Sequence, residues 1–285
     1  MTARAKGGAV AAAPAATAVR ARSNLQMAAR RFVRQRLALV GLGITAILLL
    51  IAIFAPLLAP ESYDYADLAS ANEFPSSAHW FGTDTIGHDY LSRIIYGIRT
   101  SMLVGFLAVF LACCIGVPLG LIAGLYGGAV DFLIMRVVDV MTAFPGILFA
   151  IFLIGLTGWV TMCRLMRAQL LTLREQEYVT AARSIGASEF AIAVRHLLPN
   201  ALAPLIIVIT LAIPSAIFTE AGLSFLGIGI NEPTPSLGKM VAASADYIRV
   251  FWHLGLFPTV AIALAMLGFT FVGDGLRDAL DARGR

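Results

Sequence analysis

Few side chains in this sequence could carry out chemistry, and they do not assemble into a catalytic set. Asp84 and Asp89 flank a glycine and could serve a metal ion or an acid–base pair, although a turn and a helix cap are the simpler interpretation. The histidines are scattered along the chain, at positions 79, 88, 196 and 253. The cysteines have neither disulfide nor metal-site spacing. The sequence therefore predicts no catalytic residue, no metal site and no cofactor in this chain.

A nucleotide-binding loop is also missing from the sequence. Such a loop needs two glycines separated by four residues, followed by Lys and then Ser or Thr. The lysines are Lys6, which follows an alanine, and Lys239, which is followed by a methionine. Any ATP hydrolysis must therefore occur in a partner protein, and we expect the chain not to be an enzyme by itself.

Glu220 is the clear acidic residue inside a long apolar segment. A carboxyl group within a membrane costs free energy, so it is a functional candidate by default. It could face a translocation path and meet the amino terminus of a peptide. It could instead cap the helix fragment after Pro214 or lie near the outer interface, and we favour such a structural role.

The elements that must position these groups are membrane-spanning helices. Of 285 residues, 59% are hydrophobic and 13% are charged, whereas soluble domains carry about 25% charged residues. Residues 37–59 and 100–126 contain no charge. Each run exceeds the ~20 residues that a helix needs to cross about 30 Å of hydrocarbon. The sequence therefore predicts an all-α protein within a lipid bilayer, and we expect no nucleic-acid partner.

The charge asymmetry predicts the orientation, because Lys and Arg accumulate in cytoplasmic loops. Residues 1–36 hold eight basic and no acidic residues, whereas 60–98 hold six acidic residues and one Arg. Residues 164–196 contain five Arg. We therefore expect a basic, largely disordered cytoplasmic tail at 1–36. A first span with an extracytoplasmic loop would follow at 37–98, and this loop has room for short helices.

Further spans are predicted at 101–123, 202–226 and 251–273, with an outer loop at 231–249. Gly127, Gly128 and Asp131 are expected to form a short cytoplasmic turn.

The stretch 132–163 conflicts with the charge rule. One span there would place the Arg-rich segment outside, whereas two spans would each be too short to cross alone. We expect either a re-entrant or kinked hairpin, or a segment from which residues are missing, and parity favours about six spans. The hairpin would bend at Pro145, Gly146, Gly155 and Gly158. Arg136 and Asp139, three residues apart, are expected to pair with each other.

Residues 174–199 predict two short cytoplasmic helices joined by a glycine turn. Tyr178, Ala181, Ala182 and Ile185 have the spacing of one helical face. Gly186 would end the first helix at positive φ. The second would begin at the cap Ser188 with Glu189 in its first turn, and would stop at Pro199. The small-residue face could dock into a partner, or the segment could simply rest on lipid headgroups.

This segment resembles the EAA loop of binding-protein-dependent ABC importer permeases. In that loop an E-A-A triplet is followed after three residues by Gly and later by a Leu-Pro ending. The matching residues are Thr180, Ala181, Ala182, Gly186, Leu198 and Pro199. Thr180 departs from the acidic residue of the family, and Glu177, one turn earlier, could partly replace it. The resemblance implies that Glu177, Thr180, Ala181, Ala182, Arg183 and Gly186 bind ATPase subunits.

Other stretches resemble the C-type permease of dipeptide and oligopeptide importers. Residues 81–93 resemble its FGTD-x-x-GRD-x-x-SR signature, with His88 in place of Arg, and residues 221–227 read AGLSFLG. The resemblance covers about residues 30–280, and it departs most clearly near 153–158. It implies a type I permease fold with its core at 99–280 and coupling helices at about 174–199.

The resemblance also implies partners and a location. These are a second similar permease, one or two ABC ATPases that hold ATP and Mg, and an extracytoplasmic substrate-binding protein, at the cytoplasmic membrane of a bacterium. Together they would import di- or oligopeptides. An ion-gradient-driven transporter or channel stays open as the alternative, and would predict paired charges within spans and an inverted repeat. An intramembrane enzyme would need a convergent polar set, which the sequence does not suggest.

Overall fold

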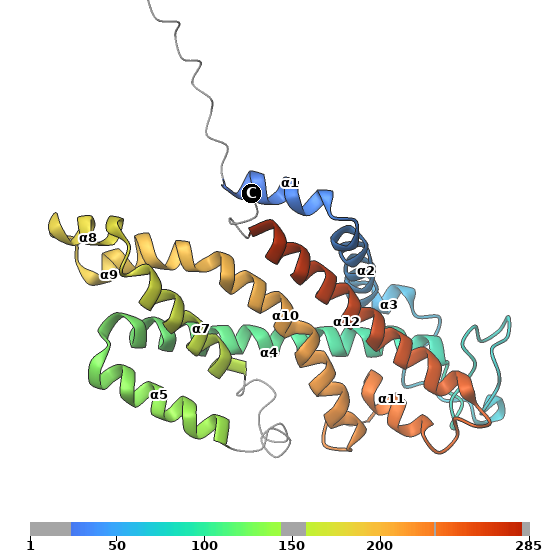
Figure 1. The fold of residues 1–285 in the computed structure, drawn as a ribbon. Helices are drawn as coiled ribbons and strands as arrows, with labels where there is room; N and C mark the ends of the chain where they lie inside the picture. The colour runs from blue at the N-terminus through green and yellow to red at the C-terminus, as the bar shows by residue number, and fades with distance from the viewer. Residues whose placement is uncertain (1–23, 144–157, 231, 281–285) are drawn as a thin grey trace, which may run out of the picture.

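The computed structural model describes residues 24–143, 158–230 and 232–280, and every regular element in these ranges is a helix (Figure 1). The predicted all-α fold is therefore confirmed. Four helices in the described ranges are long and apolar enough to cross a membrane. In Figure 1 the short helices α8 and α9 lie at one end of the molecule, and α11 lies toward the other.

The first predicted span is α2 (Arg36–Ile53), followed by the single turn α3 (Ala55–Leu58). It is preceded by α1 (Asn24–Arg34), which packs near α12, so this part of the predicted disordered tail is helical. The outer loop after α3 contains the 3₁₀ turn η1 (Leu68–Ser70).

The second span, α4 (Tyr90–Tyr126), begins well before the predicted residue 101. The prediction was too short because Arg93 and Arg99 interrupt the apolar pattern, although a capped helix can carry such residues at its outer end. Asp89 caps this helix by accepting a hydrogen bond from the backbone N–H of Ser92 at 2.8 Å. The helix ends at Gly127, whose φ is +61°.

Two helices, rather than one, occupy the conflicting stretch 132–163. They are α5 (Gly128–Ala143) and α7 (Gly158–Leu173), so Asp131 belongs to the first turn of α5 and not to a loop. The described part of each helix has 16 residues. Gly158 is the first described residue of α7, and the other predicted bend residues, Pro145, Gly146 and Gly155, lie outside the described residues.

A row of glycines, four residues apart, brings α4 against α7. A Cβ atom on Gly116 would lie 2.3 Å from the carbonyl oxygen of Trp159, and one on Gly120 would lie 2.4 Å from that of Cys163. Farther along, Gly124 faces Leu170. Residue numbers along α4 increase in the same direction as those of the α7 residues they contact, so the two helices run parallel and pack closely. Residue 173 therefore emerges on the same side as residue 126, as the charge rule requires.

The next span does not begin where it was expected. After α8 (Glu177–Ser184), the helices α9 (Glu189–Ile192), η2 (Ala193–Leu197, a π-helical turn) and α10 (Leu198–Phe225) follow without a break. The prediction that Pro199 stops the helix is wrong. Pro199 lies at the start of α10, where the missing N–H is tolerated because the wider π turn precedes it.

The connection after α10, expected to be a loop at 231–249, contains a helix. This helix, α11 (Leu237–Ser244), packs against α10 and α12 (Trp252–Leu280). Met240 of α11 and Ile217 of α10 belong to one buried apolar cluster with Leu254 and Phe269 of α12. The outer ends of the long helices are therefore covered by α11.

Candidate functional site

Residues 174–199 fold as their local sequence predicts. Gly186 has φ +84° and ends α8, with its N–H bonded to the carbonyl of Arg183 at 2.9 Å and that of Ala187 bonded to Ala182 at 3.1 Å. Ser188 then caps α9 by accepting a hydrogen bond from the N–H of Ala191 at 3.3 Å. The glycine turn and the second helix start are thus confirmed.

The predicted single face of α8 is wrong for Ala182. Val179 and Ala182 are buried and pack inward, whereas Tyr178, Ala181 and Ile185 are exposed. Val179 and Ala182, three residues apart, form the inner face of α8. The side chain of Ala182 therefore packs against its own protein and is not available to a partner. The other residues predicted to bind ATPase subunits are exposed, namely Glu177, Thr180, Ala181, Arg183 and Gly186.

Two large apolar side chains project from the surface of this segment. Ile185 is 86% exposed and Phe190 is 73% exposed. We call Tyr178, Ala181, Ile185 and Phe190 the docking tip. Apolar groups gathered on a short surface element are typical of a protein–protein contact.

The docking tip stands on a rigid base. Below it, α7, α8, α9 and α10 share one buried apolar cluster, made of Met166, Leu170, Val179, Ala182, Ile192, Leu197 and Ala201. The Arg183 guanidinium makes two hydrogen bonds to the Glu189 carboxylate, at 2.8 and 3.0 Å, which joins α8 to α9. This carboxylate raises the pKa of Arg183, which therefore keeps its charge. One exposed ion pair and a common apolar core connect the two short helices.

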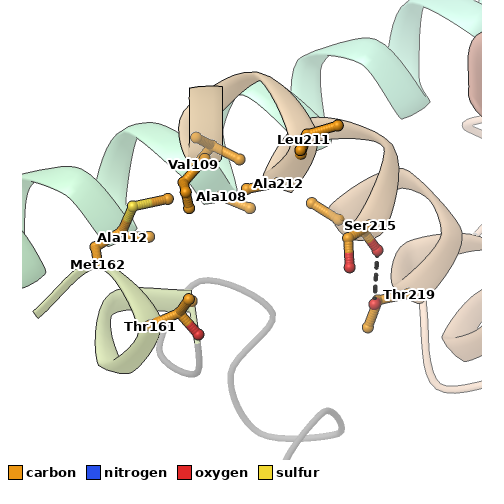
Figure 2. A pocket seen from close by; sticks show the side chains of 12 residues that line it. Ala108, Val109, Ala112, Thr161, Met162, Leu211, Ala212, Ser215 and Thr219 are labelled. Carbon is orange, nitrogen blue, oxygen red and sulfur yellow. Dashed lines mark hydrogen bonds between the residues drawn. The ribbon is translucent and has the colours of Figure 1, made fainter. Parts of the chain in front are cut away.

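A cavity of about 350 Å³ lies between α4, α7 and α10 (Figure 2). Its lining is uncharged and mostly small, with hydroxyl groups from Thr161, Ser215 and Thr219. The hydroxyl of Thr219 donates a hydrogen bond to the carbonyl of Ser215 at 2.8 Å. Such a wall offers weak polar contacts and no fixed charge to a solute.

Glu220 follows Thr219 but does not line this cavity. Its side chain is 1% exposed and accepts hydrogen bonds from three serine hydroxyls. In this conformation the carboxyl group offers no surface to a passing peptide. These contacts support a structural role more than a position on the path, and the sequence could not show them because two of the three serines lie on other segments.

The polar residues of the third and fourth membrane segments pair across helices. Asp139 of α5 bonds Arg164 of α7 at 2.9 Å, so the expected pairing of Asp139 with Arg136 is wrong. Arg136 instead lies over the ring of Phe132, 5.0 Å from its centre. The Arg167 guanidinium holds both carboxylate oxygens of Asp131. Tertiary partners replaced the local pair because α5 and α7 lie side by side.

In the outer loop, Asp84 accepts hydrogen bonds from the N–H groups of Ile86 and His88 at 3.0 Å each, so its predicted turn role is confirmed together with the cap role of Asp89. Among residues 24–143, 158–230 and 232–280, no cluster of three His, Cys, Asp or Glu could hold a metal ion.

Known proteins are similar in sequence to this chain over most of its length. Residues 116–285 match the family described as binding-protein-dependent transport system inner membrane component. Residues 23–75 match the N-terminal TM domain of oligopeptide transport permease C.

Among curated proteins, the dipeptide transport system permease protein DppC of Alkalihalophilus pseudofirmus is 44% identical over 264 residues, which cover 88% of this chain and 87% of the relative. The oligopeptide transport system permease protein OppC of Bacillus subtilis is 40% identical, with 89% and 88% covered. The glutathione transport system permease protein GsiD of Pectobacterium atrosepticum is 39% identical, with 89% of each chain covered. The chain therefore belongs to the family of binding-protein-dependent transport system inner membrane components.

Proposed function

We propose that this chain is one of two membrane-spanning subunits of an ATP-driven importer of di- or oligopeptides, with its N-terminus in the cytoplasm of a bacterium. Its relatives carry dipeptide, oligopeptide and glutathione transport in their names. The observation that carries the proposal is the docking tip, where Ile185 and Phe190 are exposed on a rigidly supported segment. An exposed apolar tip of this kind calls for a protein partner.

In this proposal the partner of the docking tip is a cytoplasmic ATPase that holds ATP and Mg. Glu177, Thr180, Ala181, Arg183 and Gly186 surround the contact, and Ala182 supports it from within. A second, similar permease subunit would complete the path, and an extracytoplasmic binding protein would deliver the peptide. The uncharged cavity between α4, α7 and α10 suits peptides of varied side chains, because it has no charge to reject them.

The mechanism is alternating access. ATP-driven closure of the ATPase pair would move the docking tip. Because α9, η2 and α10 form one continuous helix, the same movement reaches the wall of the cavity. The cavity would then open to one side of the membrane at a time.

Two substitutions at the docking tip test the proposal. Burial of one large apolar side chain contributes roughly 1.5–3 kcal/mol, so Ile185→Ser or Phe190→Ser should weaken ATPase binding by about tenfold to a hundredfold. Both side chains are exposed, so the permease should still fold and insert. The measurement is the amount of ATPase that co-purifies with the tagged chain in mild detergent.

Leu57→Ser is the matched control, because Leu57 is 81% exposed but lies on α3, toward the outer loop. It should leave ATPase binding unchanged. Equal ATPase recovery with all three variants would refute the docking site. Peptide uptake into proteoliposomes that proceeds without ATP would favour a gradient-driven transporter instead.

A further inference from the structure

The buried carboxyl group of Glu220 joins three elements at the outer end of the molecule. Its Oε2 accepts a hydrogen bond from Ser101 of α4 at 3.0 Å. Its Oε1 accepts one from Ser236, the residue that precedes α11, at 2.6 Å and one from Ser224 of its own helix at 2.8 Å. Ser101, Ser236 and Glu220 are each at most 1% exposed. We call these four residues the Glu220 cluster.

The Glu220 cluster is satisfied only while α4, α10 and α11 keep this arrangement. A buried carboxyl group that loses its donors is strongly unfavourable, so the three elements resist separation. Close backbone packing reinforces this link. A Cβ atom on Gly238 of α11 would lie 2.2 Å from the carbonyl oxygen of Ala221, the residue after Glu220. At this point α10 and α11 can only move together.

The other end of the same helix carries Phe190 of the docking tip, and the other three residues of the tip lie just before this helix, on α8 and at its C-cap Ile185. Glu189–Phe225 is one continuous helix of 37 residues, about 55 Å long. Glu220 lies near its outer end. A displacement of the docking tip therefore has a continuous path to the Glu220 cluster.

Helix α11, which is linked to Glu220 through Ser236, forms one wall of an outer pocket. This pocket, of about 410 Å³, lies between the start of α4, the loop before α11, and α11 itself. Its polar rim includes Asp84, Arg93, Glu232 and Lys239. Arg93 bonds Glu232 at 3.1 Å and Asp84 at 3.3 Å, which is a second link between α4 and the loop before α11. A shift of α11 would change the width of this pocket.

We propose that Glu220 is a positioning residue that transmits the movement of α10 to α11 and α4, so that the outer pocket opens and closes with the docking tip. Ser101 and Ser236 are its two contacts between elements. This inference rests on the proposed function, because the movement that Glu220 would transmit begins with ATPase binding at the docking tip.

The test uses the complete complex in proteoliposomes, with the binding protein and a peptide supplied outside. Glu220→Gln and Ser236→Ala should lower the number of peptides imported per ATP hydrolysed by at least about fivefold, the lower end of typical coupling between sites. Basal ATP hydrolysis should stay at the wild-type rate. Glu220→Ala should lower the ratio further than Glu220→Gln, because an amide can still bond the serine hydroxyls.

Ser244→Ala is the matched control. Ser244 is a buried serine of α11 that lines the outer pocket, as Ser236 does, but its hydroxyl donates to the carbonyl of Val241 in its own helix at 2.7 Å and not to Glu220. It should keep the wild-type ratio. The ratio is measured per ATP, so a variant that merely assembles less complex would not change it. If Glu220→Gln does not assemble, Ser101→Ala and Ser236→Ala, alone and combined, give the same test.

The outcomes separate this inference from the proposed function. Wild-type complex that shows no ATP-dependent uptake would overturn the importer itself. Wild-type uptake together with an unchanged ratio in the Glu220 and Ser236 variants would overturn only the positioning role. A loss of ratio in Ser244→Ala equal to that in Ser236→Ala would also overturn it, since packing rather than the carboxyl contact would then be responsible.

Discussion

At Gly186 the backbone conformation, rather than the surrounding space, restricts the residue type. Its φ is +84°, and a Cβ atom built there would meet nothing within 4 Å. A left-handed conformation costs an L-residue about 1–2 kcal/mol, and a β-branched side chain is the least suited to it. The turn that aims α8 against α9 therefore depends on a glycine, even though a larger side chain would fit.

Gly186→Val should consequently misalign the docking tip while the membrane helices stay intact. We expect normal insertion but a loss of ATP-coupled peptide uptake, measured in proteoliposomes with the ATPase present. Gly43→Val is the control, because Gly43 lies in α2, also has nothing within 4 Å of its Cβ position, and has no positive φ. Normal uptake by the Gly186 variant would rule out the docking geometry.

At the scale of elements, two ion pairs join α5 to α7. The Asp131–Arg167 pair is partly buried, with side chains 16% and 32% exposed. The Asp139–Arg164 pair is more open, at 56% and 46%. We expect the more open pair to be in contact with water, where solvent screens it, so the two pairs should differ in how much they stabilise the helices.

Asp131→Asn should therefore destabilise the protein more than Asp139→Asn. We expect about 1–3 kcal/mol for the first, between the values for exposed and buried pairs, and below about 1 kcal/mol for the second. Thermal unfolding of the detergent-solubilised chain measures both. Equal shifts in the melting temperature would show that the Asp131–Arg167 pair does not hold α5 to α7.

The continuity of α9, η2 and α10 is the second feature of this scale. A proline ordinarily kinks or ends a helix when it falls in its interior, and by that rule Pro199 was expected to end the second short helix. The helix continues through Pro199 because a π-helical turn precedes it. This turn shifts the backbone hydrogen-bonding pattern at the position where the proline lacks an N–H donor. Local sequence rules could not distinguish a helix end from a helix that continues with a wider turn.

For the whole molecule, the pairing of α5 with α7 decides which side of the membrane each loop occupies. The parallel packing of α4 and α7 places Tyr126 and Ile185 on one side. The acidic loop after α3, including Trp80, should lie on the other side, and the positive-inside rule predicts that the first side is the cytoplasmic one.

Single cysteines should report this arrangement directly. After replacement of Cys113, Cys114 and Cys163, a cysteine at Trp80, which is 71% exposed, should react with an impermeant maleimide from outside intact cells. Cysteines at Tyr126 and Ile185, 73% and 86% exposed, should react only after the membrane is opened. Labelling of Tyr126 and Ile185 from opposite sides would contradict the two-helix hairpin.

The sequence by itself determined the membrane class, most of the spans, the glycine turn at Gly186 and the caps at Asp89 and Ser188. These features depend on runs of apolar residues or on neighbours in the chain, because a membrane helix satisfies its backbone hydrogen bonds within itself. Contacts between distant segments had to come from the tertiary structure. The inward rotation of Ala182, the partner of Asp139 and the three serines around Glu220 depend on how each helix is turned against the next, which local sequence does not specify.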